Sequence, residues 1–280
     1  MKLPALIQEQ FAKFRWINER FGNHIRLPSP DHWKKMTDTD IWIRVVGQVV
    51  VVGNSEPAKQ LANPSIRKKL NYESLCSVSE VNAAEQIGKV LREIGTRYVS
   101  ERNPEVSSKI VALVKNLVFL KKYMGGPRGF IRDLAELGTS EERWKCVAKH
   151  LSYIKHKGAR DFLTTGFGLA TDRIALDSRV MGVVSSIVPT LPAKVPPTGY
   201  AVIEEFLIDE VCKPLKIPPA HFDQLLYVYS REILAELGSM APARDLTSLS
   251  TEALQLHYQQ ILAELQRRNE VPALRSPTAE

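Results

Sequence analysis

One lysine and one aspartate have residue types and a spacing that suit covalent chemistry at an electron-poor carbon. Lys157 directly follows two further cationic residues, Lys155 and His156, and Asp177 stands 20 residues later. A neutral lysine amine is a nucleophile that forms a Schiff base with a carbonyl or sugar carbon. A nearby carboxylate stabilises the positive charge that develops on that carbon. The two residues are therefore candidates for a catalytic pair, and residue type and spacing leave open the alternative of a surface lysine and an aspartate that only caps a helix.

A helix, a polar break and a second helix are expected to position this pair. Residues 144–151 and 159–163 carry apolar side chains at helical spacing, and the polar stretch between them interrupts the pattern. Gly166 and Gly168 are expected to end the second helix, because glycine is favoured just past a helix C-terminus. Asp177 precedes another apolar helical pattern and suits the cap of a third helix. The second helix and the loop after it can bring the carboxylate back to the lysine.

The residues around the pair carry a resemblance to a known family. Residues 157–166 read KGARDFLTTG and residues 174–179 read IALDSR. These segments resemble the helix-hairpin-helix DNA glycosylase superfamily, and within it the prokaryotic and archaeal 8-oxoguanine DNA glycosylase/AP lyase group, whose pattern is K-E-A-S-H-F-L-R-N-x-G followed by A-I-x-D-x-H. On this resemblance the catalytic lysine falls on Lys157 and the catalytic aspartate on Asp177.

Further segments extend the resemblance over residues 37–230. Residues 95–98 are similar to a G-x-R stretch of the family, residues 200–204 to a Y-x-x-I-E segment, and residues 222–227 to an L-D-x-x-x-W/Y segment. The resemblance implies an all-α, two-lobed fold over residues 1–244, with the hairpin at about 151–157 and the pair in the cleft between lobes. Residues 245–280 are expected to form a C-terminal helix and a disordered tail.

The resemblance implies a base-excision repair enzyme that removes 8-oxoguanine or another modified base from DNA. Lys157 would attack C1′ of the sugar, and Asp177 would stabilise the cationic sugar. This DNA N-glycosylase and AP lyase chemistry needs no metal ion or other cofactor. Two alternatives stay open: a monofunctional glycosylase for a different modified base, and a non-catalytic DNA-binding protein of the same fold.

The expected partner is double-stranded DNA carrying a damaged base. Family hairpins usually have glycines two and four residues before the lysine, where this chain has Lys155 and Tyr153. A cationic side chain at the first of these positions can replace the phosphate contact that the glycine backbone makes. The residues expected along the DNA backbone are Lys155, His156, Arg179, Arg97 and Arg128.

The base pocket is expected to take residues from two distant segments. Residues 41–55 are rich in valine, which favours a strand, but the rest of the chain has helical periodicity and the matching family segment is a buried helix. We therefore expect a helix that leads Gln48 and Asn54 to the base, since an amide both donates and accepts hydrogen bonds. Asp223 and Tyr227 are expected to hold and stack on the extruded base. The alternatives are a surface glutamine, a turn asparagine, a helix cap and a core tyrosine.

Composition agrees with a DNA-binding protein of a reducing compartment. The formal net charge of +7 favours a polyanionic partner. The three cysteines are scattered and make no disulfide framework or iron–sulfur motif. The histidines show no zinc-binding spacing. No apolar run has the length of a signal sequence or a membrane span. We expect a cytoplasmic, nucleoid-associated monomer.

Overall fold

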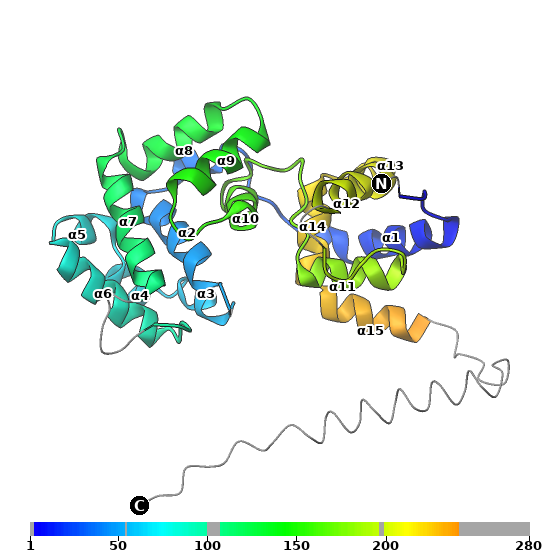
Figure 1. The fold of residues 1–280 in the computed structure, drawn as a ribbon, viewed down its shortest axis with the longest axis horizontal. Coiled ribbons are helices and arrows are strands. Elements are labelled where there is room, and N and C mark those ends of the chain that lie inside the picture. Colours follow the sequence, from blue (N-terminus) through cyan, green and yellow to red (C-terminus); the bar gives the residue numbers. More distant parts are fainter. Residues whose placement is uncertain (1–2, 54, 100–106, 196–198, 241–280) are drawn as a thin grey trace, which may run out of the picture. The chain divides into compact units, whose positions relative to one another are not determined.

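The computed structural model describes residues 3–53, 55–99, 107–195 and 199–240, and these form helices and no β-strand (Figure 1). The expected all-α fold is confirmed. The α-helices are α1 (Gln8–Phe21), α2 (Asp38–Val50), α3 (Glu56–Gln60), α4 (Pro64–Lys69), α5 (Tyr72–Cys76), α6 (Glu80–Glu93), α7 (Ser108–Lys122), α8 (Gly126–Glu136), α9 (Ser140–His150), α10 (His156–Phe167), α11 (Ser178–Ile187), α12 (Tyr200–Leu207), α13 (Lys213–Leu215), α14 (Pro219–Val228) and α15 (Ser230–Met240). The 3₁₀-helices η1 (Gly22–His24) and η2 (His32–Lys35) and the π-helix η5 (Ile208–Cys212) complete the set.

Helix α2 confirms the helical interpretation of the valine-rich segment. Thr37 accepts a hydrogen bond from the Asp40 backbone N–H, and the Asp40 carboxylate accepts one from the Thr37 backbone N–H. This reciprocal cap satisfies donors that a helix start leaves free. Seven of the 13 residues of α2 are buried, and α3, α5, α7, α8 and α10 all pack on it. Burial on nearly every side overcomes the low intrinsic helix propensity of valine.

Local capping sets three helix boundaries, and the last of them differs from the sequence prediction. Residues 57–70 split into α3 and α4, because Asn63 caps a new helix at Pro64. Residues 124–129 already contain the start of α8, since Gly125 takes a left-handed conformation with φ +80° and serves as its N-cap. Gly166 lies inside α10, and Gly168 alone provides the left-handed C-cap, with φ +66°.

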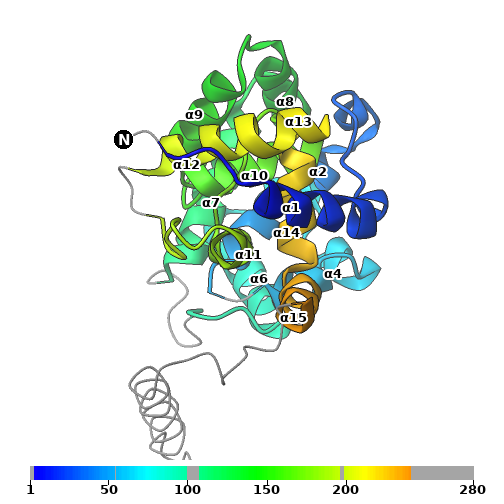
Figure 2. The same ribbon diagram turned by 90° about the vertical axis from the view of Figure 1, so that its right-hand side faces the viewer.

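Buried apolar side chains form one core cluster from residues 33–170. Helices α1, α11 and α14 carry another set of buried residues, in which the rings of Phe14 and Phe222 meet edge-on at 5.7 Å. Helices α1 and α11 both pack against α14, as Figures 1 and 2 show. Helix α10 packs on α9 and α2, and it contributes the lysine of the candidate site.

Residues Met1–Ser230 form one compact unit, and Arg231 begins a second unit, of which α15 is the described part. The predicted helix and tail at 245–280, together with the boundary at 244, lie outside the described residues. The division of the first unit into two lobes remains a prediction. Within the described ranges, no helix is long and apolar enough to cross a membrane.

Candidate active site

The hairpin between α9 and α10 keeps a glycine-like turn without glycine. Tyr153 has φ +71°, in the left-handed region that costs a non-glycine residue about 1–2 kcal/mol. This is one of the two positions where the family usually has glycine. Lys155, at the other position, has an ordinary extended backbone with φ −84° and ψ 178°. The chain therefore retains the left-handed turn at 153, whereas the backbone at 155 needs no glycine.

A buried asparagine holds this hairpin in place. Asn116 on α7 is fully buried; its Nδ2 donates to the Ser152 carbonyl at 3.1 Å, and its Oδ1 accepts from the Ser152 N–H at 2.6 Å. The amide thus satisfies both backbone groups of one hairpin residue, as a neighbouring strand would. This residue was not among the predicted site residues; its one sequence signal is an asparagine among the apolar residues of α7.

The predicted pair is brought together. Lys157 lies in the first turn of α10, and its Nζ is 3.4 Å from Oδ2 of Asp177. The lysine side chain is 57 % exposed and that of the aspartate 10 %. The other oxygen of Asp177, Oδ1, accepts from the backbone N–H groups of Arg179 and Val180, both at 2.8 Å, and so caps α11. The aspartate is therefore both a helix cap and the partner of the lysine, one oxygen for each.

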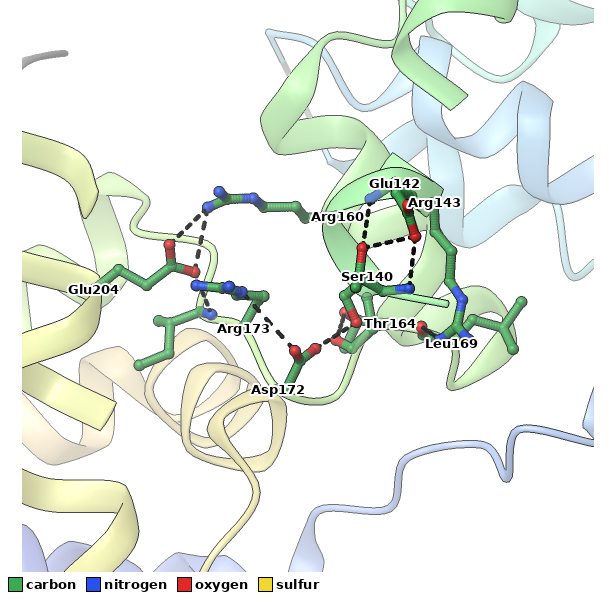
Figure 3. Close-up of polar contacts among 12 residues, drawn as sticks. Ser140, Glu142, Arg143, Arg160, Thr164, Leu169, Asp172, Arg173 and Glu204 are labelled. Carbon is green, nitrogen blue, oxygen red and sulfur yellow. Dashed lines mark hydrogen bonds and ion pairs between the residues drawn. The ribbon is translucent and has the colours of Figure 1, made fainter. Parts of the chain in front are cut away.

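A buried polar network fixes the loop that leads to this aspartate (Figure 3). Glu204 on α12 accepts from the Ile174 N–H at 3.0 Å and from the Arg160 guanidinium of α10 at 3.3 Å. The Tyr200 hydroxyl accepts from the Leu176 N–H at 2.9 Å and donates to the Ile174 carbonyl. Burial raises the pKa of Glu204, and the charge of Arg160 opposes that rise. Helix α12 thus sets the position of the loop relative to α10.

The guanidinium of Arg160 is further held between two aromatic rings. Its central carbon lies 5.1 Å from the centre of the Trp144 ring and 4.9 Å from that of the Tyr200 ring. Close by, Asp172 of the same loop accepts from Ser140 at the start of α9 (Figure 3). These contacts tie the loop to the helices on both sides of the hairpin.

The pair lies on the wall of a cleft of about 920 Å³. A cleft of this size is typical of small-molecule sites and has room for one nucleobase. The cleft also contains the predicted base-pocket residues Gln48, Asp223 and Tyr227. The fourth, Asn54, lies outside the described residues.

Two further carboxylates give the cleft an acidic interior. Asp223 is 4 % exposed; burial, reinforced by the charges of Asp161 and Asp177, raises its pKa to about 8. Burial also raises the pKa of Asp161, against a hydrogen bond from Gln48 and the charge of Lys157. Asp161 was not among the predicted site residues. Its position one helical turn after Lys157, on the same face, was the only signal.

Three of the predicted DNA-backbone residues lie at this cleft. Lys155 and Arg179 line it. The guanidinium of Arg179 covers one face of the Tyr227 ring, 4.7 Å from its centre, so that face is not available to a base. Arg97 donates to the carbonyl of Gly53, a residue of the cleft wall, at 3.3 Å.

The other two are engaged elsewhere. The ring of His156 packs edge-on against that of Trp144, with 4.8 Å between centres. Arg128 lies in the first turn of α8, where its guanidinium donates to the Lys34 carbonyl at 3.2 Å. The structure does not bring Arg128 to the cleft.

Comparison with known proteins shows what this arrangement is similar to. No protein-family profile and no curated protein matches the sequence. Among solved structures, the 8-oxoguanine DNA glycosylase of Thermotoga maritima is 17 % identical, with a TM-score of 0.56 over 80 % of this chain and 97 % of that one. That of Methanocaldococcus jannaschii is 13 % identical, with a TM-score of 0.52 over 78 % and 87 %. The 8-oxoguanine glycosylase/lyase of the latter organism in complex with a 15mer DNA containing 8-oxoguanine is 11 % identical, with a TM-score of 0.53 over 79 % and 96 %. The chain therefore has the fold of the helix-hairpin-helix 8-oxoguanine DNA glycosylases.

Proposed function

We propose that this protein is a base-excision repair glycosylase with AP lyase activity, which removes 8-oxoguanine or another modified base from double-stranded DNA. The observation that carries the proposal is the separation of 3.4 Å between Lys157 Nζ and Asp177 Oδ2 at a cleft large enough for a base. The fold shared with 8-oxoguanine glycosylases supports it.

The proposed cycle begins when DNA binds and one nucleotide leaves the duplex. Extrusion costs a few kcal/mol of unstacking, least for a damaged base. Lys155 and Arg179 at the cleft, and Arg97 at its wall, supply positive charge for the neighbouring phosphates. The extruded base enters the cleft between Gln48 and Asp223.

The chemical step joins Lys157 to the sugar. Its Nζ, after losing a proton, forms a bond to C1′ while the glycosidic bond breaks and its electron pair leaves with the base. Asp177 Oδ2 faces the positive charge that develops on the sugar and accepts a proton from the lysine. Ring opening gives an imine; loss of a proton from C2′ then expels the 3′ phosphate and nicks the strand.

Borohydride trapping tests this proposal. Duplexes carrying either 8-oxoguanine or an abasic site are incubated with the wild type, Lys157→Gln or Asp177→Asn. We expect a covalent adduct with the wild type and none with Lys157→Gln. Asparagine caps a helix about as well as aspartate, so Asp177→Asn removes the charge and keeps α11. Lys145→Gln is the matched control, because this lysine is 59 % exposed and pairs with Glu141 on α9, away from the cleft.

Each other outcome favours a different function. An adduct with the abasic duplex alone retains the lyase and rejects oxidised guanine as the substrate. Base release that survives Lys157→Gln and is abolished by Asp177→Asn indicates a monofunctional glycosylase. Salt-sensitive DNA binding with neither adduct nor base release indicates a non-catalytic binding protein.

A further inference from the structure

Asp161 has no role in the chemistry described above, yet it makes a specific contact in the cleft. Its Oδ2 accepts from Gln48 Nε2 at 2.7 Å, although the two residues are 113 positions apart in sequence. Both side chains line the same cleft. The main-chain carbonyl of Asp161 accepts from the Thr165 hydroxyl at 2.8 Å, one turn further along α10.

This contact determines which end of the Gln48 amide faces which neighbour. Gln48 Nε2 is the atom that donates to Asp161 Oδ2, so the NH₂ end of the amide points to Asp161. The oxygen end then lies over Gly158, where a side-chain carbon would be 3.7 Å from Oε1. Glycine leaves that space open, and Gly158 itself lines the cleft. The cleft thus presents the oxygen of Gln48 as an acceptor beside Gly158.

We propose that Asp161 is a positioning residue that fixes the Gln48 amide with its oxygen toward the base, so that the cleft selects a base carrying an N–H donor at the edge it presents there. The proposal rests on the proposed function. 8-Oxoguanine and guanine form a matched pair for it, since position 7 is an N–H donor in the first and a bare acceptor in the second. A fixed oxygen favours the donor and opposes the acceptor.

The test separates base selection from the chemistry on the sugar. In the Lys157→Gln background, the lysine nucleophile is absent and binding can be measured alone. The selectivity ratio is the dissociation constant for a duplex carrying guanine divided by that for a duplex carrying 8-oxoguanine. Asp161→Asn is nearly isosteric, and its own amide can donate to Gln48 and so allow the amide to turn over. We expect this ratio to fall about tenfold, which corresponds to about 1.4 kcal/mol. In a Gln48→Leu background the same change should have no further effect, because the residue through which it acts is gone.

The second readout is strand nicking at an abasic site, measured with Lys157 in place. No base is present there, so Asp161→Asn should change the nicking rate by a smaller factor than it changes the selectivity ratio. Asp209→Asn, an exposed aspartate of η5 paired with Lys213, is the matched control and should change neither readout.

Five results would overturn the inference. An unchanged selectivity ratio, or an equal loss in the Gln48→Leu background, shows that Asp161 does not act through Gln48. A parallel loss of abasic nicking shows that Asp161 acts on Lys157 instead. If the wild type nicks abasic DNA but does not bind 8-oxoguanine more tightly than guanine, the inference is overturned and the proposed lyase activity is still supported. A wild type with neither activity overturns the proposed function as well.

Discussion

Replacing Glu204 with leucine should destabilise the fold and disconnect the catalytic loop at the same time. The side chains of Glu204 and Arg160 are only 2 % and 13 % exposed, so water screens their charges weakly. Glu204→Leu leaves the guanidinium without its carboxylate and the Ile174 N–H without its acceptor. Breaking a buried ion pair from one side costs about 3–5 kcal/mol. Because the nitrogen–oxygen distances of this pair are long, 3.3 Å, we expect the lower end, about 3 kcal/mol.

Urea denaturation of four proteins measures this effect: the wild type, Glu204→Leu, Arg160→Leu and the double variant. The double variant should be more stable than the sum of the single losses predicts, because it buries no unpaired charge. Borohydride trapping by Glu204→Leu, at a urea concentration where it remains folded, should be at least tenfold slower, since the loop no longer holds Asp177 beside Lys157. A loss of unfolding free energy below about 1 kcal/mol, or strictly additive losses, would refute the argument.

Two further predictions concern the walls of the cleft. Asp223 has a folded-state pKa of about 8, above its ordinary value of about 3.9. Between these two pH values the folded protein keeps a proton on Asp223 that the unfolded chain has already released. The contribution of Asp223 to stability is therefore present below about pH 4 and is lost as the pH rises through about 8. Asp223→Asn should flatten a plot of unfolding free energy against pH over this range. An unchanged slope would contradict the raised pKa of Asp223. Asn116→Leu leaves the N–H and carbonyl of Ser152 without partners and should lower the unfolding free energy by about 1–3 kcal/mol. It should also slow abasic nicking, whereas a stable variant with full nicking activity would show that the hairpin needs no such support.

Several predictions made from short-range sequence signals are confirmed. The Asp177 cap of α11 is readable within four residues, because both of its hydrogen bonds connect neighbours in sequence. The glycine at position 168 likewise marked the end of α10, since left-handed backbone is a property of the residue itself. The resemblance located Lys157 and Asp177, and the structure confirms that they meet. The chemistry assigned to them remains a proposal.

Other features depended on contacts between distant segments. The valine content of α2 favoured a strand, and only the five helices packed around it show why it is a helix. Arg128 looked equivalent to Arg97 in sequence, yet packing takes it to the start of α8. The left-handed turn at Tyr153 goes against residue preference, and the buried Asn116 supports the hairpin from another helix.

The sequence by itself determined the helical class, the caps and the pair that can do chemistry, because these depend on residue type and short-range spacing. Only the tertiary structure decided the depth and charge of the cleft. Burial, reinforced by the charges of Asp161 and Asp177, gives Asp223 its high pKa, and Gln48 donates a hydrogen bond to Asp161, which in the sequence is an ordinary helical aspartate. Burial and hydrogen-bond direction are set by which side chains converge in space, and Gln48 lies 113 positions before the aspartate to which it donates.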